Sequence, residues 1–400
     1  MSLPSPLRAR GDDDPTKVSF FELFFDLVFV FAVTQLSHRL LSHLTVAGAL
    51  QTGLLLLAVW WCWMYTTWTT NWFDPDHPVF RMVLVGVMLA GLLMASSVPE
   101  AFEGRGLWFA AGYTAVQVGR TLYVVWSTRG TQLGPNFRRI LVWIAAACAL
   151  WLAGGLAGGT ALIVLWILAS VVDLAGPPTG YAVPGLGRSS TEDWSSIDGG
   201  HMAERCQLFT IIALGESVLV TGVTYASAAE TGPAATVAFG LAFLGSVALW
   251  WIYFDQTAEA SAEAIASSDD PGRIGRSAYT YEHIPMVAGI IVGAVGDELI
   301  IAHPTGHTTA GTAAVVIGGA ALFLSGHLLF KRTVFGQWSS PRLVALGSLA
   351  LLAVAYPLLS PVLLGVAVLL VLVMVASWDA VLVRSRANAE AATVTSAQTA

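Results

Sequence analysis

The chain has 400 residues, of which 56% are apolar and only 11% charged, and its formal net charge at pH 7 is −7. A soluble globular protein carries about 25% charged residues, so this composition excludes a soluble fold. The acidic charge argues against nucleic acid as a partner, and the three cysteines form no disulfide pattern.

Apolar runs broken by charges, proline and glycine predict the course of the chain, because about 20 apolar residues span a bilayer as an α-helix. A polar tail, 1–19, precedes six predicted spans near 20–37, 48–67, 80–98, 107–127, 139–155 and 158–175. A Gly/Pro/Ser-rich linker, 176–202, follows them. Six more spans lie near 203–223, 235–254, 283–301, 311–330, 343–359 and 361–383, and 384–400 form a second polar tail. We expect an all-α integral membrane protein whose first span is not a cleaved signal peptide.

The distribution of Lys and Arg predicts the orientation of these spans, because basic residues accumulate in cytoplasmic loops. With the N-terminus inside, 15 of the 19 basic residues fall in inside segments. Only Arg39 and Arg105 fall outside, and Arg120 and Arg205 lie within spans. We therefore expect both tails and the 176–202 linker to be cytoplasmic.

The two halves, 20–175 and 203–383, resemble each other. Tryptophan pairs occupy the second and eighth spans, and an aspartate closes the sixth and twelfth. The distance from Arg120 to Asp173 is 53 residues, and that from His327 to Asp379 is 52 residues. This pattern predicts two parallel six-helix repeats, an arrangement in which transporters bind substrate at the repeat interface. The alternative is a chance likeness between two hydrophobic halves.

Ionisable residues inside spans are costly to insert and are the best candidates for function. In the first span, Glu22 and Asp26 are four residues apart and share one helical face. Two such carboxylates resist double ionisation, which a shared proton or a bound cation would relieve. The alternative is that both lie at the helix N-terminus, where the helix dipole and wet headgroups favour them.

The seventh span opens with His201, Glu204 and Arg205, which share one face, and carries Glu216 three turns deeper. Arg205 can neutralise one carboxylate, and Arg120 of the fourth span is a candidate partner for Glu216. The alternative for the first three residues is a structural ion pair that fixes helix packing.

The ninth span begins beside Tyr281 and His283 and ends in an outer cluster of Asp297, Glu298, His303 and His307. Such groups could take up protons, because histidine titrates near neutral pH. A metal site is disfavoured, because no His-Glu-x-x-His motif or cysteine pair occurs. We predict no cofactor and no catalytic residue. Gly289 and Gly293 form a Gly-x-x-x-Gly, which predicts close helix packing within the chain.

Several segments resemble the bacterial low temperature requirement protein A family. They are Glu22-Leu-Phe-Phe-Asp26-Leu-Val-Phe-Val30, Glu204-Arg205, Leu214-Gly215-Glu216-Ser217, Trp250-Trp251-Ile-Tyr253-Phe254 and Tyr281-x-His283. The resemblance covers roughly 17–385 and implies a polytopic fold in a bacterial inner membrane. It implies no agreed substrate or reaction, and no catalytic role is carried over from it.

The leading functional hypothesis is a secondary transporter or proton-linked permeation protein for an unidentified small solute or ion. Its candidate substrate- or proton-binding residues are Glu22, Asp26, Arg120, His201, Glu204, Arg205, Glu216, Tyr281 and His283. The alternative is a non-transporting membrane factor for cold growth or envelope function, or an intramembrane enzyme that acts on lipids. We expect no enzyme, because no recognisable nucleophile is present. The sequence leaves the oligomeric state open.

Overall fold

The computed structural model describes residues 6–8, 17–190, 192–194, 197–227, 232–268 and 270–399, without the side chains of 192, 256 and 386–399. Over these residues the fold is all-helical and contains no strand, apart from two isolated bridges, Leu7 with Phe73 and Val183 with Gly187. Ten of its helices are long and apolar enough to cross a membrane. The predicted all-α membrane fold is therefore confirmed.

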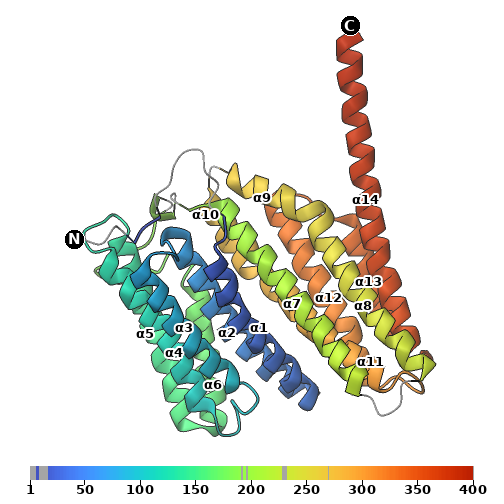
Figure 1. Cartoon of the computed structure of the whole chain (residues 1–400), viewed down its shortest axis with the longest axis horizontal. Coiled ribbons are helices and arrows are strands. Elements are labelled where there is room, and N and C mark those ends of the chain that lie inside the picture. The colour runs from blue at the N-terminus through green and yellow to red at the C-terminus, as the bar shows by residue number, and fades with distance from the viewer. Residues whose placement is uncertain are drawn as a thin grey trace. The chain divides into compact units, whose positions relative to one another are not determined.

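The elements in chain order are shown in Figure 1. They are α1 (Phe20–Ser42), α2 (Val46–Trp72), α3 (Pro78–Ser96), α4 (Gly106–Ser127), α5 (Gly134–Ala157), α6 (Gly159–Ala175), η1 (Glu192–Trp194), α7 (Gly199–Ser227), α8 (Pro233–Tyr253), η2 (Phe254–Ala258), α9 (Glu259–Ala266), α10 (Pro271–Ile274), η3 (Gly275–Tyr281), α11 (His283–Ala302), α12 (Ala310–Phe335), α13 (Ser340–Ala355), η4 (Tyr356–Leu358) and α14 (Pro361–Thr399).

A helix lies at each of the twelve predicted spans, but the count of twelve spans is not confirmed. The helices α4 and α6 are not among the ten that meet the criteria of length and apolarity. Two details differ from prediction. Arg39, predicted in an outer loop, lies in the last turn of α1 and is buried. Residues 255–282, between two predicted spans, are largely helical and include the π-helical turns η2 and η3.

The chain divides into two compact units. Unit 1 comprises Met1–Ala213 and Ile265–Ile284, and unit 2 comprises Leu214–Ala264 and Pro285–Ala400. The helix α7 is therefore divided between them. The domain bounds expected from the sequence, with a linker at 176–202, stay a prediction.

Within unit 1, successive helices pack as neighbours: α3 contacts α4, α4 contacts α5, and α5 contacts α6. The helix α1 contacts α2 and α3, while α2 also reaches α4 and α6. Close approach of α3 and α4 requires Gly112, because a Cβ there would lie 2.8 Å from the Cβ of Met94. A buried cluster of Phe109, Trp151 and Trp166 fills the space between α4, α5 and α6. Trp166 fits here because position 154 is a glycine: a Cβ on Gly154 would lie 2.6 Å from Cδ1 of Trp166.

Within unit 2, α8 packs against α14, and α12 contacts α13 and α14. The helices α11 and α12 meet through glycines. A Cβ on Gly289 would lie 2.5 Å from the backbone nitrogen of Phe323, and one on Gly319 would lie 2.6 Å from that of Gly293. The Gly-x-x-x-Gly of α11 therefore packs on α12 within the chain, as the sequence predicts.

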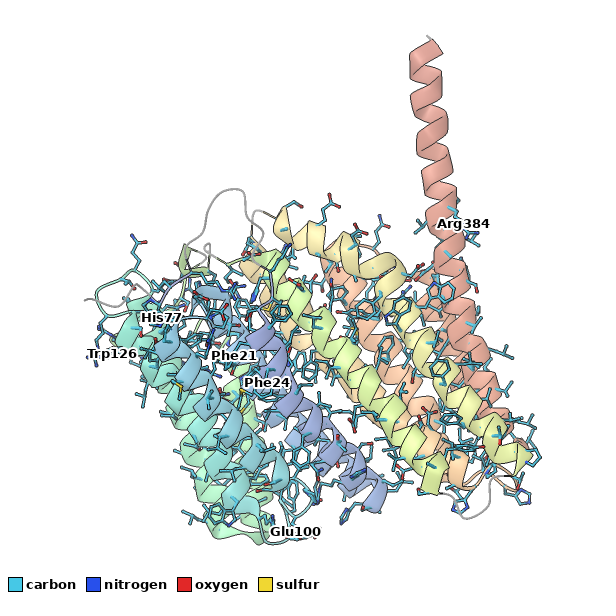
Figure 2. The ribbon with its side chains drawn as sticks, in the orientation of Figure 1. Phe21, Phe24, His77, Glu100, Trp126 and Arg384 are labelled. Atoms are coloured by element: carbon cyan, nitrogen blue, oxygen red, sulfur yellow. The ribbon has the colours of Figure 1, made fainter. Side chains whose placement is uncertain are left out.

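Large apolar side chains also cover the outer helix surfaces. Phe24 and Trp126 are more than half exposed, at 55% and 59%, on α1 and α4 (Figure 2). Val354, near the end of α13, and Leu358, in η4, are 79% and 87% exposed. Exposed apolar surface on this scale is typical of a membrane protein, in which lipid covers such side chains.

Candidate functional site

The first part of the candidate site begins at the N-terminus of α1. Ser19 caps the helix: its Oγ accepts from the backbone N–H of Glu22 at 3.2 Å, and its own backbone N–H donates to Oε2 of Glu22 at 2.9 Å. This reciprocal pair is a capping box. Glu22 therefore lies at a helix N-terminus, which is one part of the alternative interpretation given above. Its carboxylate nevertheless lies fully inside the protein, at 1% exposure.

The helix α7 presents two basic side chains to the two carboxylates of α1. Nε2 of His201 lies 3.0 Å from Oε1 of Glu22, and Nη2 of Arg205 lies 2.8 Å from Oδ1 of Asp26. Both pairs are spaced four residues apart on their helices, so one turn of α1 faces one turn of α7. All four side chains are buried. Arg205, which is expected from the sequence to neutralise a carboxylate, contacts Asp26 of another helix.

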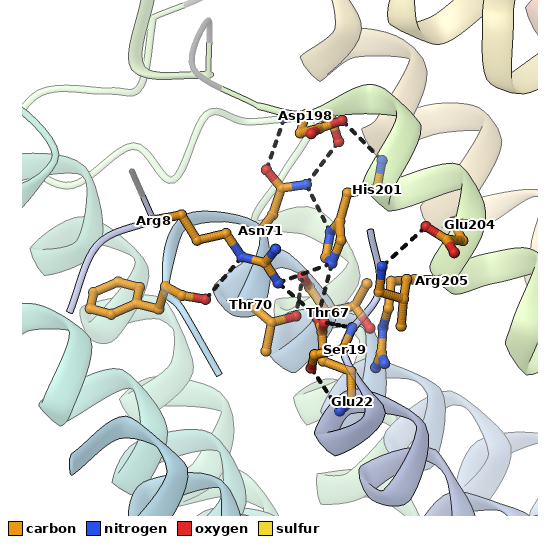
Figure 3. A network of polar contacts seen from close by, with 12 residues as sticks. Arg8, Ser19, Glu22, Thr67, Thr70, Asn71, Asp198, His201, Glu204 and Arg205 are labelled. Carbon is orange, nitrogen blue, oxygen red and sulfur yellow. Dashed lines mark hydrogen bonds and ion pairs between the residues drawn. The ribbon is translucent and has the colours of Figure 1, made fainter. Parts of the chain in front are cut away.

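The tautomer of His201 follows from its second neighbour, Asn71 of α2 (Figure 3). The backbone N–H of Asp198 donates to Oδ1 of Asn71 at 2.9 Å, which fixes the orientation of the amide. The amide nitrogen of Asn71 then donates to the carbonyl of Asp198 and to Nδ1 of His201. Because Nδ1 accepts, the neutral imidazole carries its proton on Nε2 and donates it to Glu22.

Arg8 completes the surroundings of Glu22, and sequence reasoning missed it. The segment 6–8 lies along the end of α2: Leu7 bridges Phe73, and the backbone N–H of Arg8 donates to the carbonyl of Trp72 at 2.9 Å. Nη2 of Arg8 is 3.1 Å from Oε2 of Glu22. Nothing in the polar pattern of the tail singles Arg8 out, because its position depends on contacts with residues 65 positions away.

The Asp26–Arg205 pair is less completely satisfied. Nε1 of Trp63 donates to the same Oδ1 of Asp26 at 2.8 Å, so that oxygen accepts twice. Oδ2 of Asp26 and the Nε and Nη1 atoms of Arg205 are buried without a hydrogen-bond partner. The guanidinium lies over the rings of Phe25 and Trp63, at 5.8 and 5.7 Å. The faces of these aromatic rings stabilise the positive charge of Arg205, whose Nε and Nη1 atoms form no hydrogen bond with the carboxylate.

These contacts change the interpretation of the two carboxylates. Each has a basic partner from another element, so neither a shared proton nor a bound cation is required to relieve repulsion between them. A buried, paired network of this kind joins α1, α2 and α7 and fits a structural role well. The alternative of a structural ion pair that fixes helix packing therefore describes His201 and Arg205 better than a proton relay.

The other predicted residues lie apart from this network or at its edge. Glu204 accepts from the backbone N–H of Val18 at 3.2 Å. Arg120 donates to Thr66 and Gln117, and the predicted pairing of Arg120 with Glu216 is not among these contacts. Glu216 belongs to unit 2 and is buried there.

Tyr281 ends η3, His283 begins α11, and the two side chains contact different groups. The hydroxyl of Tyr281 donates to the carbonyl of Leu174 at 2.7 Å. His283 is fully buried between the rings of Trp60 and Tyr279, and its Nδ1 donates to the carbonyl of Ala278. In these contacts both side chains bind backbone carbonyls, of Leu174 and Ala278, rather than the carboxylates of α1.

The second part of the candidate site is a cavity within unit 2. It lies among α7, α8, α11, α12 and α14 and, with its open mouth, has a volume of about 640 Å³. Glycine and alanine line much of it, together with the hydroxyl side chains of Ser217 and Ser246. Asp297 of α11 is its charged residue, and no lining residue that the structure describes is basic. The described residues give the Asp297 carboxylate no hydrogen bond or ion pair.

No group of three or more His, Cys, Asp or Glu side chains is placed to bind a metal among the residues described above. The three cysteines are free and buried.

Comparisons with known proteins agree with the helical membrane fold. Residues 17–377 match the family model described as bacterial low temperature requirement A protein. A relative from Rhizobium meliloti (strain 1021), described as an uncharacterized protein, is 40% identical over 326 residues, which cover 81% of this chain and 79% of the relative. No solved structure gives a significant match.

Proposed function

Because the chain belongs to the bacterial low temperature requirement A family, and is a membrane protein with several apolar helices, we propose that it is a secondary transporter or proton-linked permeation protein for a small solute or ion. The observation that carries this proposal is the carboxylate of Asp297 in the unit 2 cavity. It replaces Glu22 and Asp26, whose charges are already paired, as the group that takes up a proton or cation.

The physical argument rests on the cost of an isolated charge. An ionised carboxylate without a partner in an apolar environment is strongly unfavourable, so the group binds a proton or a cation instead. Asp297 has no basic neighbour in the cavity, while Ser217 and Ser246 supply oxygen atoms that could share an ion. A carboxylate that is neutralised and released in turn is the basic requirement of proton- or cation-linked transport.

Two parallel six-helix repeats are part of this proposal. In unit 2, Asp379 pairs with Arg342, with 2.6 Å between Oδ2 and Nη2. Its predicted counterpart in unit 1, Asp173, instead accepts hydrogen bonds from Tyr113 and Trp151. If the halves are related by a repeat, Asp173 and Asp379 occupy equivalent positions, and each has acquired its own kind of partner.

Proton movement into proteoliposomes tests the role of Asp297. With an imposed pH gradient and an internal pH-sensitive dye, wild-type protein should accelerate equilibration, and Asp297→Asn should reduce that rate at least about tenfold. The matched control is Glu298→Gln, the same change on the next residue, which does not line the cavity. It should retain the wild-type rate. Equal rates for wild-type protein and empty liposomes, across proton and cation gradients, would exclude the proposal.

The proposed orientation, with both tails and the 176–202 linker in the cytoplasm, is tested by cysteine labelling. In a variant without Cys62, Cys148 and Cys206, a membrane-impermeant thiol reagent should label Thr305→Cys in intact cells and leave Ser190→Cys unlabelled. Both positions are exposed. Three predicted spans separate them, so they must lie on opposite sides.

Permeabilised cells supply the labelling control, in which both variants should react. Labelling of Ser190→Cys alone in intact cells would mean that the orientation is inverted. Labelling of both would mean an even number of spans between them.

A second candidate is a non-transporting membrane factor for cold growth or envelope function. The buried ion pairs of Glu22 with His201 and of Asp26 with Arg205 favour it, because such pairs often only hold helices together. This candidate predicts no proton flux and no effect of Asp297→Asn on growth. No described residue favours an intramembrane lipid enzyme.

A further inference from the structure

Unit 1 contains a cavity whose lining residues do not include the charged residues of α1 and α7 described above. Aromatic side chains from α2, α5 and the 176–202 segment form its walls: Trp61, Tyr65, Trp68, Trp72, Phe137, Tyr181 and Trp194. The space between the side chains, including its open mouth, is about 540 Å³. Aromatic walls with a few polar groups are typical of small-molecule sites.

Two guanidinium groups supply the charge of this cavity. Arg120 of α4 and Arg276 of η3 both line it, and no acidic residue is found among its described lining residues. Arg276 lies over the ring of Trp194 at 5.1 Å, and its Nη1 is buried without a hydrogen-bond partner. Arg120 is 1% exposed and lies over the ring of Tyr65 at 5.4 Å. Both donors are thus held in place before any ligand arrives.

The charge of Arg120 has no acid in direct contact. Its guanidinium donates to Oγ1 of Thr66 at 2.9 Å and to the amide oxygen of Gln117. The amide nitrogen of Gln117 donates to the hydroxyl of Tyr113, which in turn donates to Asp173 at 2.6 Å. In this series of hydrogen bonds, the neutral side chains of Gln117 and Tyr113 therefore lie between the Arg120 cation and Asp173. A positive charge held away from its counter-charge attracts an anion into the adjacent space.

One residue of the cavity wall, Tyr181, has an unusual backbone conformation. Tyr181 has a positive φ of 48°, which is uncommon for a residue with a side chain. Its hydroxyl lies 2.8 Å from that of Tyr65, and its ring packs on Gly176, where a Cβ would lie 2.7 Å away. Only one of the two hydroxyl protons lies between the oxygens, so the other proton can be donated to a ligand. Backbone strain of this kind is often found at ligand sites.

We propose that the unit 1 cavity binds a small organic anion, with a carboxylate or phosphate group on a compact apolar body. The guanidinium groups of Arg120 and Arg276 bind the anionic oxygens, and the tryptophan and tyrosine rings pack on the apolar body. This ligand is the solute of the proposed transporter, an identification that rests on the proposed function. Binding itself does not depend on proton movement.

Tryptophan fluorescence of the detergent-purified full chain tests the site, because four tryptophans line it. The probes are benzoate and phenyl phosphate, with benzamide and benzylammonium as the neutral and cationic comparisons. Saturable quenching by benzoate or phenyl phosphate is expected. Benzamide should bind at least about tenfold more weakly, since it lacks the charge-assisted hydrogen bonds. Benzylammonium should not bind.

Arg276→Gln should weaken binding of the anionic probe at least about tenfold and should fold, because this residue is only half-buried. The matched control is Arg273→Gln, the same change three residues earlier on an exposed side chain that does not line the cavity. It should leave the affinity unchanged. Arg120→Lys keeps the charge but loses the planar fork, so an intermediate loss is expected.

Three results would overturn the site: no saturable binding of either anionic probe, equal affinity for benzamide and benzoate, or equal effects of Arg276→Gln and Arg273→Gln. The two proposals fail separately. Anion binding without proton flux would support the anion site and exclude the transporter. Proton flux without anion binding would support the transporter and exclude the anion site. Asp297→Asn, in the other unit, should keep the affinity for the anionic probe.

Discussion

Arg205→Met should destabilise the folded protein by about 3–5 kcal/mol, the usual cost of leaving one member of a buried ion pair without its partner. Asp26 and Arg205 are both 0% exposed. Without the guanidinium, the Asp26 carboxylate keeps only the hydrogen bond from Trp63. The expected readout is a large fall in the temperature at which the detergent-purified protein loses its monodisperse peak in size-exclusion chromatography.

A double variant separates the cost of the isolated charge from the loss of packing. Asp26→Asn combined with Arg205→Met removes both charges and keeps an oxygen that can accept from Trp63, so it should recover most of the stability. Arg81→Met is the control, because the ion pair of Arg81 with Asp76 is exposed and should contribute less than about 1 kcal/mol. Equal stability of Arg205→Met and the wild type would show that the pair is not buried in the membrane-embedded protein.

Gly319→Ala should destabilise unit 2 by about 1–3 kcal/mol through steric overlap. A Cβ at this position of α12 would lie 2.6 Å from the backbone nitrogen and 2.7 Å from the Cα of Gly293 in α11. Backbone atoms cannot rotate away as the end of a flexible side chain can, so the two helices must separate. The same thermal measurement in detergent reads out the loss.

The neighbouring glycine provides the comparison for this substitution. A Cβ on Gly318 would meet nothing within 4 Å, so Gly318→Ala adds the same methyl group without a clash. It should cost nothing, since alanine is the better helix former. If both variants lost stability equally, the cause would be a change in α12 itself rather than its contact with α11.

The helices and the ionisable residues of α1 and α7 can be identified from local sequence signals. Long apolar runs predict helices, and a spacing of four places Glu22 with Asp26, and His201 with Arg205, on one face of each helix. Neither local pattern predicts that these two faces meet. The sequence offers a helix N-terminus as an alternative position for Glu22, and the structure adds Ser19, three residues earlier, as the cap of that helix.

The remaining parts of the site depend on contacts that no local pattern carries. Arg8, Asn71 and Asp198 join the network only because distant segments meet, and each is an ordinary polar residue in its own stretch of sequence. Asp297 is recognisable as an acid near a span end, but its importance comes from a cavity formed by five helices. Arg120 stands out as an intramembrane charge, although its surroundings are neutral groups rather than the predicted acid.

The separation of the ion-pair partners along the chain has a consequence for synthesis. Asp26 and Arg205 are 179 residues apart, as are Glu22 and His201, whereas Arg8 precedes Glu22 by only 14 residues. At bacterial rates of about 5–20 residues per second, roughly 10–35 s elapse before the partner of Asp26 leaves the ribosome. Glu22 and Arg8 are synthesised close together, but the partner of Asp26 follows it only 179 residues later. Until the seventh helix arrives, the Asp26 carboxyl must therefore be neutralised in another way, by a proton for example, or the first helix must stay out of bulk lipid.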